Sequence, residues 1–93
     1  MESVFHRIGL LALVGDYSDS ATDRIHRIII STSAINNFAG MSVGYADGVG
    51  TVAKFDDPYG VVISSDGTFA LVADRDNFVI RKIIMSTRLV TTV

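Results

Sequence analysis

The sequence predicts an all-β fold made of two similar four-stranded antiparallel units, and three observations lead to this prediction. The chain repeats itself over most of its 93 residues. Short runs rich in β-branched residues alternate with clusters of Gly, Asp, Asn and Ser, as strands alternate with hairpin turns. No stretch combines the apolar periodicity of an α-helix with a residue that could cap one.

The repeat is visible when the sequence is compared with itself. Residues 11–16 (LALVGD) align with residues 69–74 (FALVAD), 58 positions later. Residues 25–32 (IHRIIIST) align with residues 80–87 (IRKIIMST), 55 positions later, because the first copy has a longer connection after its Asp. The two halves of the chain are therefore copies of one unit.

The first unit covers residues 1–39. Val4 aligns with Val62 and indicates a first strand, the apolar run that follows indicates a second, and an isoleucine-rich run indicates a third. The polar turn Ser31-Thr32-Ser33 then leads into a fourth strand. We expect these strands at residues 3–6, 10–14, 24–30 and 34–39.

The apolar run at residues 8–15 has a second interpretation. It follows His6-Arg7 as the core of a secretory signal follows a basic start. Glu2 in that start and the lack of a good A-x-A cleavage site favour a strand instead. We expect no membrane span, because no apolar run approaches the roughly 20 residues that a span needs.

The second unit covers residues 60–93. Its first strand ends at Ser65-Asp66-Gly67, a strong hairpin turn signal. The polar stretch DRDN at residues 74–77 predicts a turn whose side chains bond nearby backbone, with Asp74 as its cap. We expect strands at residues 60–64, 69–73, 78–85 and 89–93, with Phe55, Phe69 and Phe78 as packing residues.

A glycine-rich segment, residues 40–59, joins the units. Its stretch GYADGVGT, residues 44–51, is neither the G-x-G-x-x-G of a dinucleotide fold nor a P-loop, since it lacks G-K-[ST]. It also leads into a strand, whereas both phosphate-binding motifs open a helix. We therefore expect Asp47-Gly48 and Gly50 to form a structural loop.

A family resemblance rests on motifs that follow one another along the second copy. In order they are GYADGVGT (44–51), AKF (53–55), PYGV (58–61), DG (66–67), VAD (72–74), Asn77, IRKI (80–83) and VTT (90–92). Over residues 40–93 this order resembles the NHL-repeat β-propellers. The first copy departs from the pattern at Gly15 and His26 and lacks the Asn. Kelch-like and β-sandwich repeats share much of the strand pattern.

The resemblance implies that each unit is one four-stranded blade of an NHL-like β-propeller. It implies further that the glycine-rich segment leaves the outer strand of one blade for the inner strand of the next. The residues that carry this structural motif are Gly44, Tyr45, Asp47, Gly48, Gly50, Pro58, Gly60, Asp66, Gly67, Asp74, Asn77 and Arg81.

No motif predicts a catalytic, cofactor-binding or metal-binding site. Zinc needs three or four converging ligands, and the chain has only His6 and His26. The D-x-D of residues 74–76 begins like a calcium loop, but the glycine and glutamate that such a loop needs are missing further on. Asp56-Asp57 before a proline is typical of a solvated turn.

The predicted function is a non-catalytic interaction module that presents a propeller face to a protein, peptide or other ligand. The alternatives are a fragment of a propeller enzyme, such as a metal-dependent lyase or lactonase, and a truncated chain without a function of its own. A formal charge of −2 makes a nucleic-acid partner improbable. The compartment stays unassigned.

Two blades cannot close a propeller ring, because closed propellers have about 4–8 blades. Some apolar residues of the repeats must then face missing neighbours. We expect either a closed homo-oligomer, with a trimer favoured, or the remaining blades of a longer parent chain. The residues from which these exposed flanks are drawn are Phe55, Phe69, Leu71, Phe78, Ile80 and Ile83.

Overall fold

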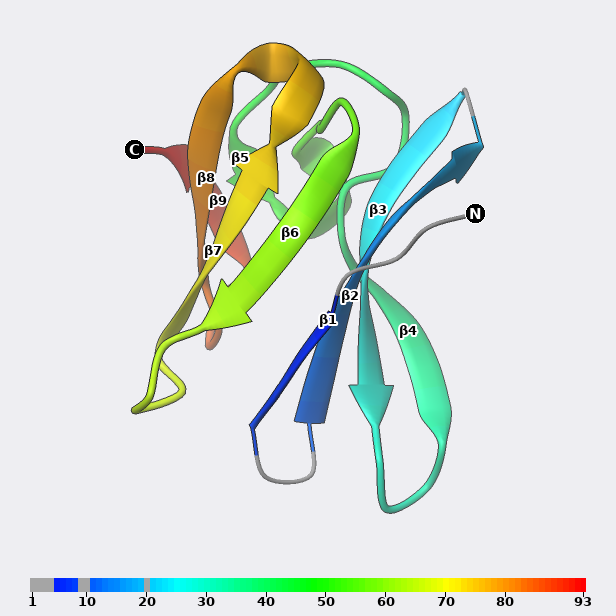
Figure 1. Cartoon of the computed structure of the whole chain (residues 1–93), viewed down its shortest axis with the longest axis vertical. Helices are drawn as coiled ribbons and strands as arrows, with labels where there is room; N and C mark the ends of the chain where they lie inside the picture. The colour runs from blue at the N-terminus through cyan, green and yellow to red at the C-terminus, as the bar shows by residue number, and fades with distance from the viewer. Residues whose placement is uncertain (1–4, 9–10, 20) are drawn as a thin grey trace.

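The protein consists of two antiparallel β-sheets, seen in a computed structural model that describes residues 5–8, 11–19 and 21–93, with side chains for 11–17 and 21–93 (Figure 1). Sheet 1 contains β1 (Phe5–Ile8), β2 (Leu11–Asp19), β3 (Thr22–Ile29) and β4 (Ala34–Ala39), in that order. Sheet 2 has the order β5-β9-β8-β7-β6, formed by β5 (Gly48–Val49), β6 (Pro58–Ile63), β7 (Phe69–Asp74), β8 (Val79–Ile84) and β9 (Leu89–Thr92).

The described residues contain no α-helix, only two single 3₁₀ turns, η1 (Gly50–Val52) and η2 (Arg75–Asn77). The all-β prediction is therefore confirmed. Both sheets are antiparallel, and consecutive strands pair through hairpins within each of them.

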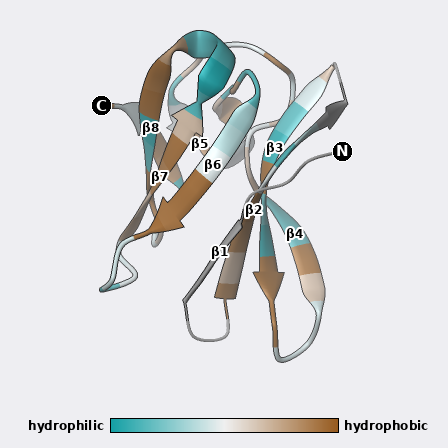
Figure 2. Ribbon diagram, viewed as in Figure 1, coloured by the Kyte–Doolittle hydropathy of each residue, from teal (hydrophilic) through white to brown (hydrophobic). Residues whose placement is uncertain are grey.

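The two sheets pack against each other through β6, which lies beside β1 and β2 (Figure 1). Side chains from both sheets meet in one apolar core, to which the segment between the sheets adds Ala53 and Phe55. In Figure 2 the strands that border this core are largely brown, whereas the η2 turn is hydrophilic. The fully buried core residues are Leu13, Ile25, Phe38, Ala39, Ala53, Phe55, Ala70, Val72, Ile83 and Val90.

The internal repeat extends to the hydrogen-bonding register of the strands. Val14 pairs with His26 and His26 with Asn37 in sheet 1. The residues at the same repeat positions in sheet 2, Val72, Arg81 and Thr92, pair in the same way. Because a register shift of one residue would turn side chains to the other face, equal registers mean that aligned residues occupy equivalent faces of the two sheets.

The first strand corrects the alignment. Phe5 pairs with Val14 in sheet 1 and Val61 pairs with Val72 in sheet 2, so the offset here is 56 and Val4 does not lie over Val62. The difference arises because fewer residues connect β1 to β2 than connect β6 to β7. Residues 3 and 4 of the expected first strand lie outside the described residues.

The β2–β3 hairpin is longer than predicted. The expected strands, 10–14 and 24–30, left a polar connection at residues 15–23, but pairing continues to Asp19 and Thr22 across a register shift. Polar residues remain in a strand here because the backbone hydrogen bonds of a hairpin do not depend on side-chain polarity. Residues 9–10 of the apolar run that could also be a signal core are not described.

Sheet 2 departs from the prediction in three places. Residues 48–49, expected as loop, form β5 and pair with β9. Strand β6 begins at Pro58 rather than at Gly60, which is compatible with its edge position because a proline cannot donate to a ladder. Phe78, expected in a strand and as a packing residue, has a left-handed backbone (φ 59°) and is 92% exposed.

Gly15 lies at a close approach of β2 to β6. A Cβ atom at this position would lie 2.4 Å from the carbonyl oxygen of Pro58, which is a backbone atom and cannot rotate away. The glycine therefore permits β2 to pack directly on β6. The second copy has Ala73 at the equivalent position.

We predict that Gly15→Ala destabilises the protein by about 1–3 kcal/mol, because the sheets must separate to admit the methyl group. Gly60→Ala is the matched control. A Cβ atom at Gly60 meets no atom within 4 Å, so its effect should stay within about 0.5–1 kcal/mol in either direction. Urea denaturation of both variants measures the difference, and equal losses would contradict the proposed sheet contact.

Candidate functional site

The guanidinium of Arg81 is the centre of a cluster of polar groups on sheet 2. Its side chain is fully buried. Nη1 donates to the carbonyl oxygen of Lys54 at 2.7 Å and to Oδ2 of Asp74 at 2.9 Å. Nη2 donates to the carbonyl oxygen of Ala46 at 2.6 Å and to Oδ1 of Asp47 at 3.0 Å.

Aromatic rings enclose this cation on two sides. The rings of Tyr45 and Phe55 have their centroids 5.1 and 5.0 Å from the guanidinium carbon of Arg81. Both residues belong to the segment between the sheets, so cation–π contacts and hydrogen bonds together hold that segment on sheet 2. We call this cluster of Asp47, Asp74, Asn77 and Arg81 the polar centre.

Asp74 plays a different part from the one that the sequence suggests. It does not cap the η2 turn with its side chain. Its buried carboxylate instead accepts hydrogen bonds from the backbone N–H of Asp56 at 2.7 Å, from Nδ2 of Asn77 at 2.8 Å and from Arg81. Asp74 therefore connects β7, β8 and the segment entering β6, a role that depends on residues far away in the sequence.

The predicted structural residues divide between the polar centre with its contacts, strands β5 and β6, and two turns. Gly44 accepts a hydrogen bond from Asn77 at 2.9 Å, and Tyr45 and Asp47 both contact Thr92. The remaining residues lie at turns or on β5 and β6. Gly48 and Gly50 lie in β5 and η1, Pro58 and Gly60 in β6, and Asp66 and Gly67 in the β6–β7 turn.

The β6–β7 turn is organised by Asp66, whose Oδ1 accepts hydrogen bonds from Ser64 Oγ, Thr68 Oγ1 and the Thr68 N–H. These bonds lower the pKa of Asp66 to about 2, with the Ser64 hydroxyl as the largest cause. Gly67 has a φ of 75°, a conformation that favours glycine. The turn is thus built locally, as its sequence indicates.

In sheet 1, Asp16 and His26 occupy the positions of Asp74 and Arg81. Nε2 of His26 lies 2.9 Å from Oδ2 of Asp16, and about a quarter of each side chain is exposed. The repeat therefore keeps an acid–base pair at this site in both sheets, but the first copy uses a shorter base. His26 contacts an acid within its own sheet, and nothing in the described residues adds a second histidine or a cysteine to it.

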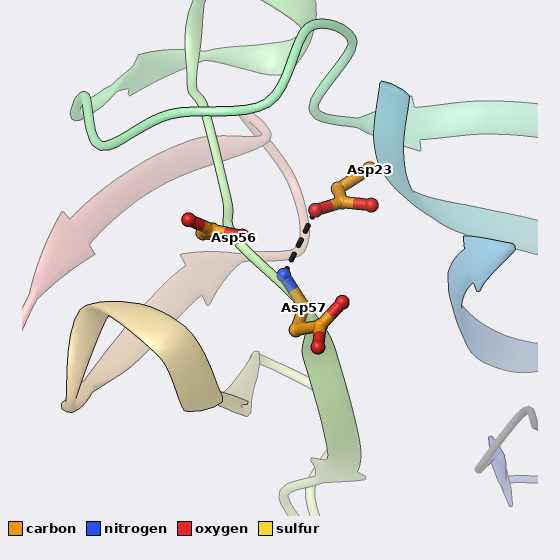
Figure 3. Close-up of side chains that lie close together, drawn as sticks. All are labelled: Asp23, Asp56 and Asp57. Atoms are coloured by element: carbon orange, nitrogen blue, oxygen red, sulfur yellow. Dashed lines mark hydrogen bonds between the residues drawn. The ribbon is translucent and has the colours of Figure 1, made fainter. Parts of the chain in front are cut away.

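A second group of carboxylates lies where the two sheets meet. One oxygen each from Asp23, Asp56 and Asp57 lies within 4.8 Å of the other two (Figure 3). Asp23 comes from β3, and the other two precede β6. Oδ2 of Asp23 accepts a hydrogen bond from the backbone N–H of Asp57 at 2.8 Å, drawn as the dashed line in Figure 3.

Burial and mutual repulsion raise pKa values in this acidic group. Burial raises the pKa of Asp23 above its ordinary value of 3.8, and the hydrogen bond from Asp57 opposes this rise in part. Burial also raises the pKa of Asp56, and the neighbouring charges of Asp76, Asp57 and Asp74 add to the rise.

The sequence interpretation missed Asp23 and placed Asp57 in a solvated turn. Asp57 has a left-handed backbone (φ 58°), and its carboxylate accepts a hydrogen bond from Arg75 Nη2 at 2.8 Å. Asp23 lies two residues before Ile25, and both are buried on the same side of β3, so an acid at a core-facing strand position was the one available signal. The D-x-D of residues 74–76 does not converge, because Asp74 is buried and Asp76 is exposed.

An apolar face forms the side of sheet 2 that points away from sheet 1. Along β6, β7 and β8, the residues between the buried ones project to this side. Val62 is 51% exposed and Ile80 is 43% exposed. We call this surface, made of Gly60, Val62, Leu71, Ala73 and Ile80, the outer face of sheet 2.

Two adjoining hollows of about 410 and 450 Å³ lie over this face. The larger one is bordered by Tyr59, Phe78 and Val93, which are 39%, 92% and 77% exposed. Arg75 lies at its rim, with its guanidinium carbon 5.0 Å from the ring centroid of Tyr59. A mostly apolar surface with a cationic and aromatic rim is typical of a protein-binding site.

Comparison with models of protein families and with curated proteins finds no match to this chain. Within the described part of the chain, no helix has the length and apolar character needed to cross a membrane.

We predict that Asp74→Ala costs about 3–5 kcal/mol of unfolding free energy, because it leaves the buried guanidinium of Arg81 without its carboxylate. Asp76→Ala, at the exposed end of the same turn, should change stability by no more than about 0.5 kcal/mol. Chemical denaturation of the two variants provides the measurement. Similar losses in both would show that the Asp74–Arg81 pair does not hold the structure together.

We also predict that Asp56→Asn stabilises the protein at pH 7, by up to about 0.5 kcal/mol. A carboxyl whose pKa is raised on folding favours the folded state at low pH and opposes it above the folded pKa. The advantage of the variant should therefore shrink as the pH falls from 7 towards the unfolded value of 3.8.

Asp66→Asn is the control with the opposite sign. The pKa of Asp66 is lowered on folding, so its carboxylate stabilises the protein above the unfolded pKa and this contribution is lost as the pH falls towards about 2. This variant should be less stable than the wild type at pH 7. Thermal melts across this pH range that moved both variants in the same direction would contradict the assignment.

Proposed function

We propose that this chain is a non-catalytic interaction module built from two NHL-like propeller blades, and that it binds a protein partner through the outer face of sheet 2. The single observation that carries the proposal is the exposure of Val62 and Ile80 on that face, 51% and 43%. Isolated apolar residues are common on protein surfaces, whereas a continuous apolar sheet face with hollows is characteristic of interaction sites.

The NHL-like part of the proposal is supported by the polar centre. The Asp, Asn and Arg of the resemblance lie within hydrogen-bonding distance of one another and of the segment between the sheets. Equal strand registers in the two sheets agree with two copies of one unit. Sheets that stack as repeats bury their apolar faces only against neighbours, which accounts for an uncovered face at the end of the stack.

The non-catalytic part is supported by the contacts of the polar centre. Both terminal nitrogens of Arg81 end on protein oxygens, and the carboxylate of Asp74 accepts three hydrogen bonds from protein groups. General acid–base catalysis needs a group within reach of a substrate proton. A fully buried pair whose carboxylate and terminal guanidinium nitrogens are held by backbone and side-chain partners is suited to holding a segment in place.

A second candidate, metal-dependent catalysis of the propeller-enzyme kind, is favoured by the acidic group of Asp23, Asp56 and Asp57. Two of its carboxylates are already engaged, since Asp23 accepts from the Asp57 backbone and Asp57 from Arg75. We therefore rank this function second.

Peptides of about ten residues, selected on the wild-type chain from a random phage-displayed library, test the leading proposal, since an exposed apolar patch is a binding site for protein segments. Ile80→Lys and Val62→Lys should weaken their binding by at least about tenfold. Val52→Lys changes a more exposed residue (65%) on η1, outside this face, and should bind like the wild type. Equal binding by all four proteins would overturn the assignment of the face.

Thermal melts with millimolar calcium or zinc test the second candidate. A metal that binds only the native state raises the melting temperature in a saturable way, by RT ln(1 + [L]/Kd) in free energy. We expect no shift for either metal. A saturable rise that Asp23→Asn abolishes would favour the metal-dependent function over the interaction module.

A further inference from the structure

The outer face of sheet 2 has a counterpart in sheet 1 that is covered at Leu13, Gly15 and Ile25. Leu13 pairs with Arg27 and Gly15 with Ile25, just as Leu71 pairs with Lys82 and Ala73 with Ile80. Ile25 is fully buried beneath sheet 2, whereas its counterpart Ile80 is 43% exposed. The molecule therefore contains one covered and one uncovered copy of the same surface.

On the opposite side of the molecule, the exposed copy belongs to sheet 1 and the buried copy belongs to sheet 2. Ile28 and Ile35 pair with each other on the side of sheet 1 that points away from sheet 2. Their counterparts, Ile83 and Val90, also pair with each other and are fully buried against sheet 1. Ile35 is 65% exposed. We call the surface formed by Val14, His26, Ile28 and Ile35 the outer face of sheet 1.

We propose that the outer face of sheet 2 binds the outer face of sheet 1 of a second copy of this chain. The contact between molecules would repeat the contact between the two sheets within one molecule, where both kinds of surface are already seen to fit each other. This inference rests on the proposed function and identifies the protein partner of the outer face of sheet 2.

His26 makes such a contact possible without a connecting segment. Arg81, its counterpart, needs the carbonyl oxygens of Lys54 and Ala46, which the segment between the sheets supplies. His26 is bonded to Asp16 within its own sheet. A sheet from another molecule can therefore cover His26 without burying a cation that needs a loop, as Arg81 does.

The contact between copies differs from the internal one in two respects. Ala73 replaces Gly15, so the approaching strand cannot come as close as Pro58 does to Gly15. The internal contact also includes Ala53 and Phe55 from the connecting segment, which two separate copies do not share. We therefore expect reversible, concentration-dependent association rather than an obligate oligomer.

The two faces lie on opposite sides of the molecule, so the contact is heterologous and forms a ring if the rotation closes or a chain if it does not. Sedimentation velocity from about 1 µM to about 1 mM covers the range in which weak interfaces associate. We expect the wild type to associate with rising concentration. Ile80→Lys and Ile35→Lys, which each destroy one face, should both remain monomeric when measured alone.

The decisive sample is an equimolar mixture of these two variants. Ile35→Lys keeps the outer face of sheet 2 intact and Ile80→Lys keeps that of sheet 1, so the mixture should form a dimer and nothing larger. Val52→Lys should associate like the wild type. Circular dichroism melts verify that each variant is folded.

Each other outcome opposes the proposal. A wild type that stays monomeric up to about 1 mM, or a mixture that does not associate, overturns the second copy as partner. If the selected peptides still bind in an Ile80-dependent way, the proposed function survives that failure. Wild-type aggregation that both single variants abolish supports the contact, whereas aggregation that either variant retains contradicts it.

Discussion

The arrangement of the whole second half of the molecule depends on one fully buried ion pair, Asp74–Arg81. A buried charge that loses its partner is destabilising. Further partners of Arg81 Nη1 and Nη2 and of the Asp74 carboxylate come from other parts of the chain, whereas Nε of Arg81 is buried without a partner among the described residues. Arg81 donates to two backbone carbonyls of the segment between the sheets, and Asp74 accepts from the backbone N–H of Asp56, just before β6. The pair therefore fixes that segment, and the segment in turn supplies Phe55 to the core.

Much of the fold could be predicted from the sequence because its strongest signals are local. The DG of Asp66-Gly67 determines a hairpin within a few residues, and the two aligned runs of eight residues differ little in composition. Strand β5 escaped prediction because two residues carry no periodicity, and their pairing with β9 is decided by the tertiary structure. Phe78 was misplaced because its apolar side chain suggested a strand, while the backbone leaves η2 in a left-handed turn.

The candidate site likewise combines residues that the sequence could predict with long-range contacts that it could not. The motif residues around Arg81 could be selected by resemblance. Its backbone partners could not, because every residue has a carbonyl oxygen and the sequence does not indicate which ones accept a hydrogen bond. Asp23 and Asp57 lie 34 residues apart and meet only because β3 and the start of β6 come together. An acid in an alternating strand is the one local sign of such a contact, and it does not say which residue lies opposite.

The origin of the partners of Arg81 also bears on the order in which the molecule folds. Sheet 1 is built entirely from consecutive hairpins, whose contacts are short in sequence and form early. The site of Arg81 combines residues 46–54 with residues 74–81. Strand β5 can pair only once β9 is in place. Closing a loop between these distant segments loses conformational entropy before their contacts can form. Sheet 1 is therefore expected to assemble first. During synthesis the glycine-rich segment would then remain open to solvent and to proteases until β8 and β9 have left the ribosome.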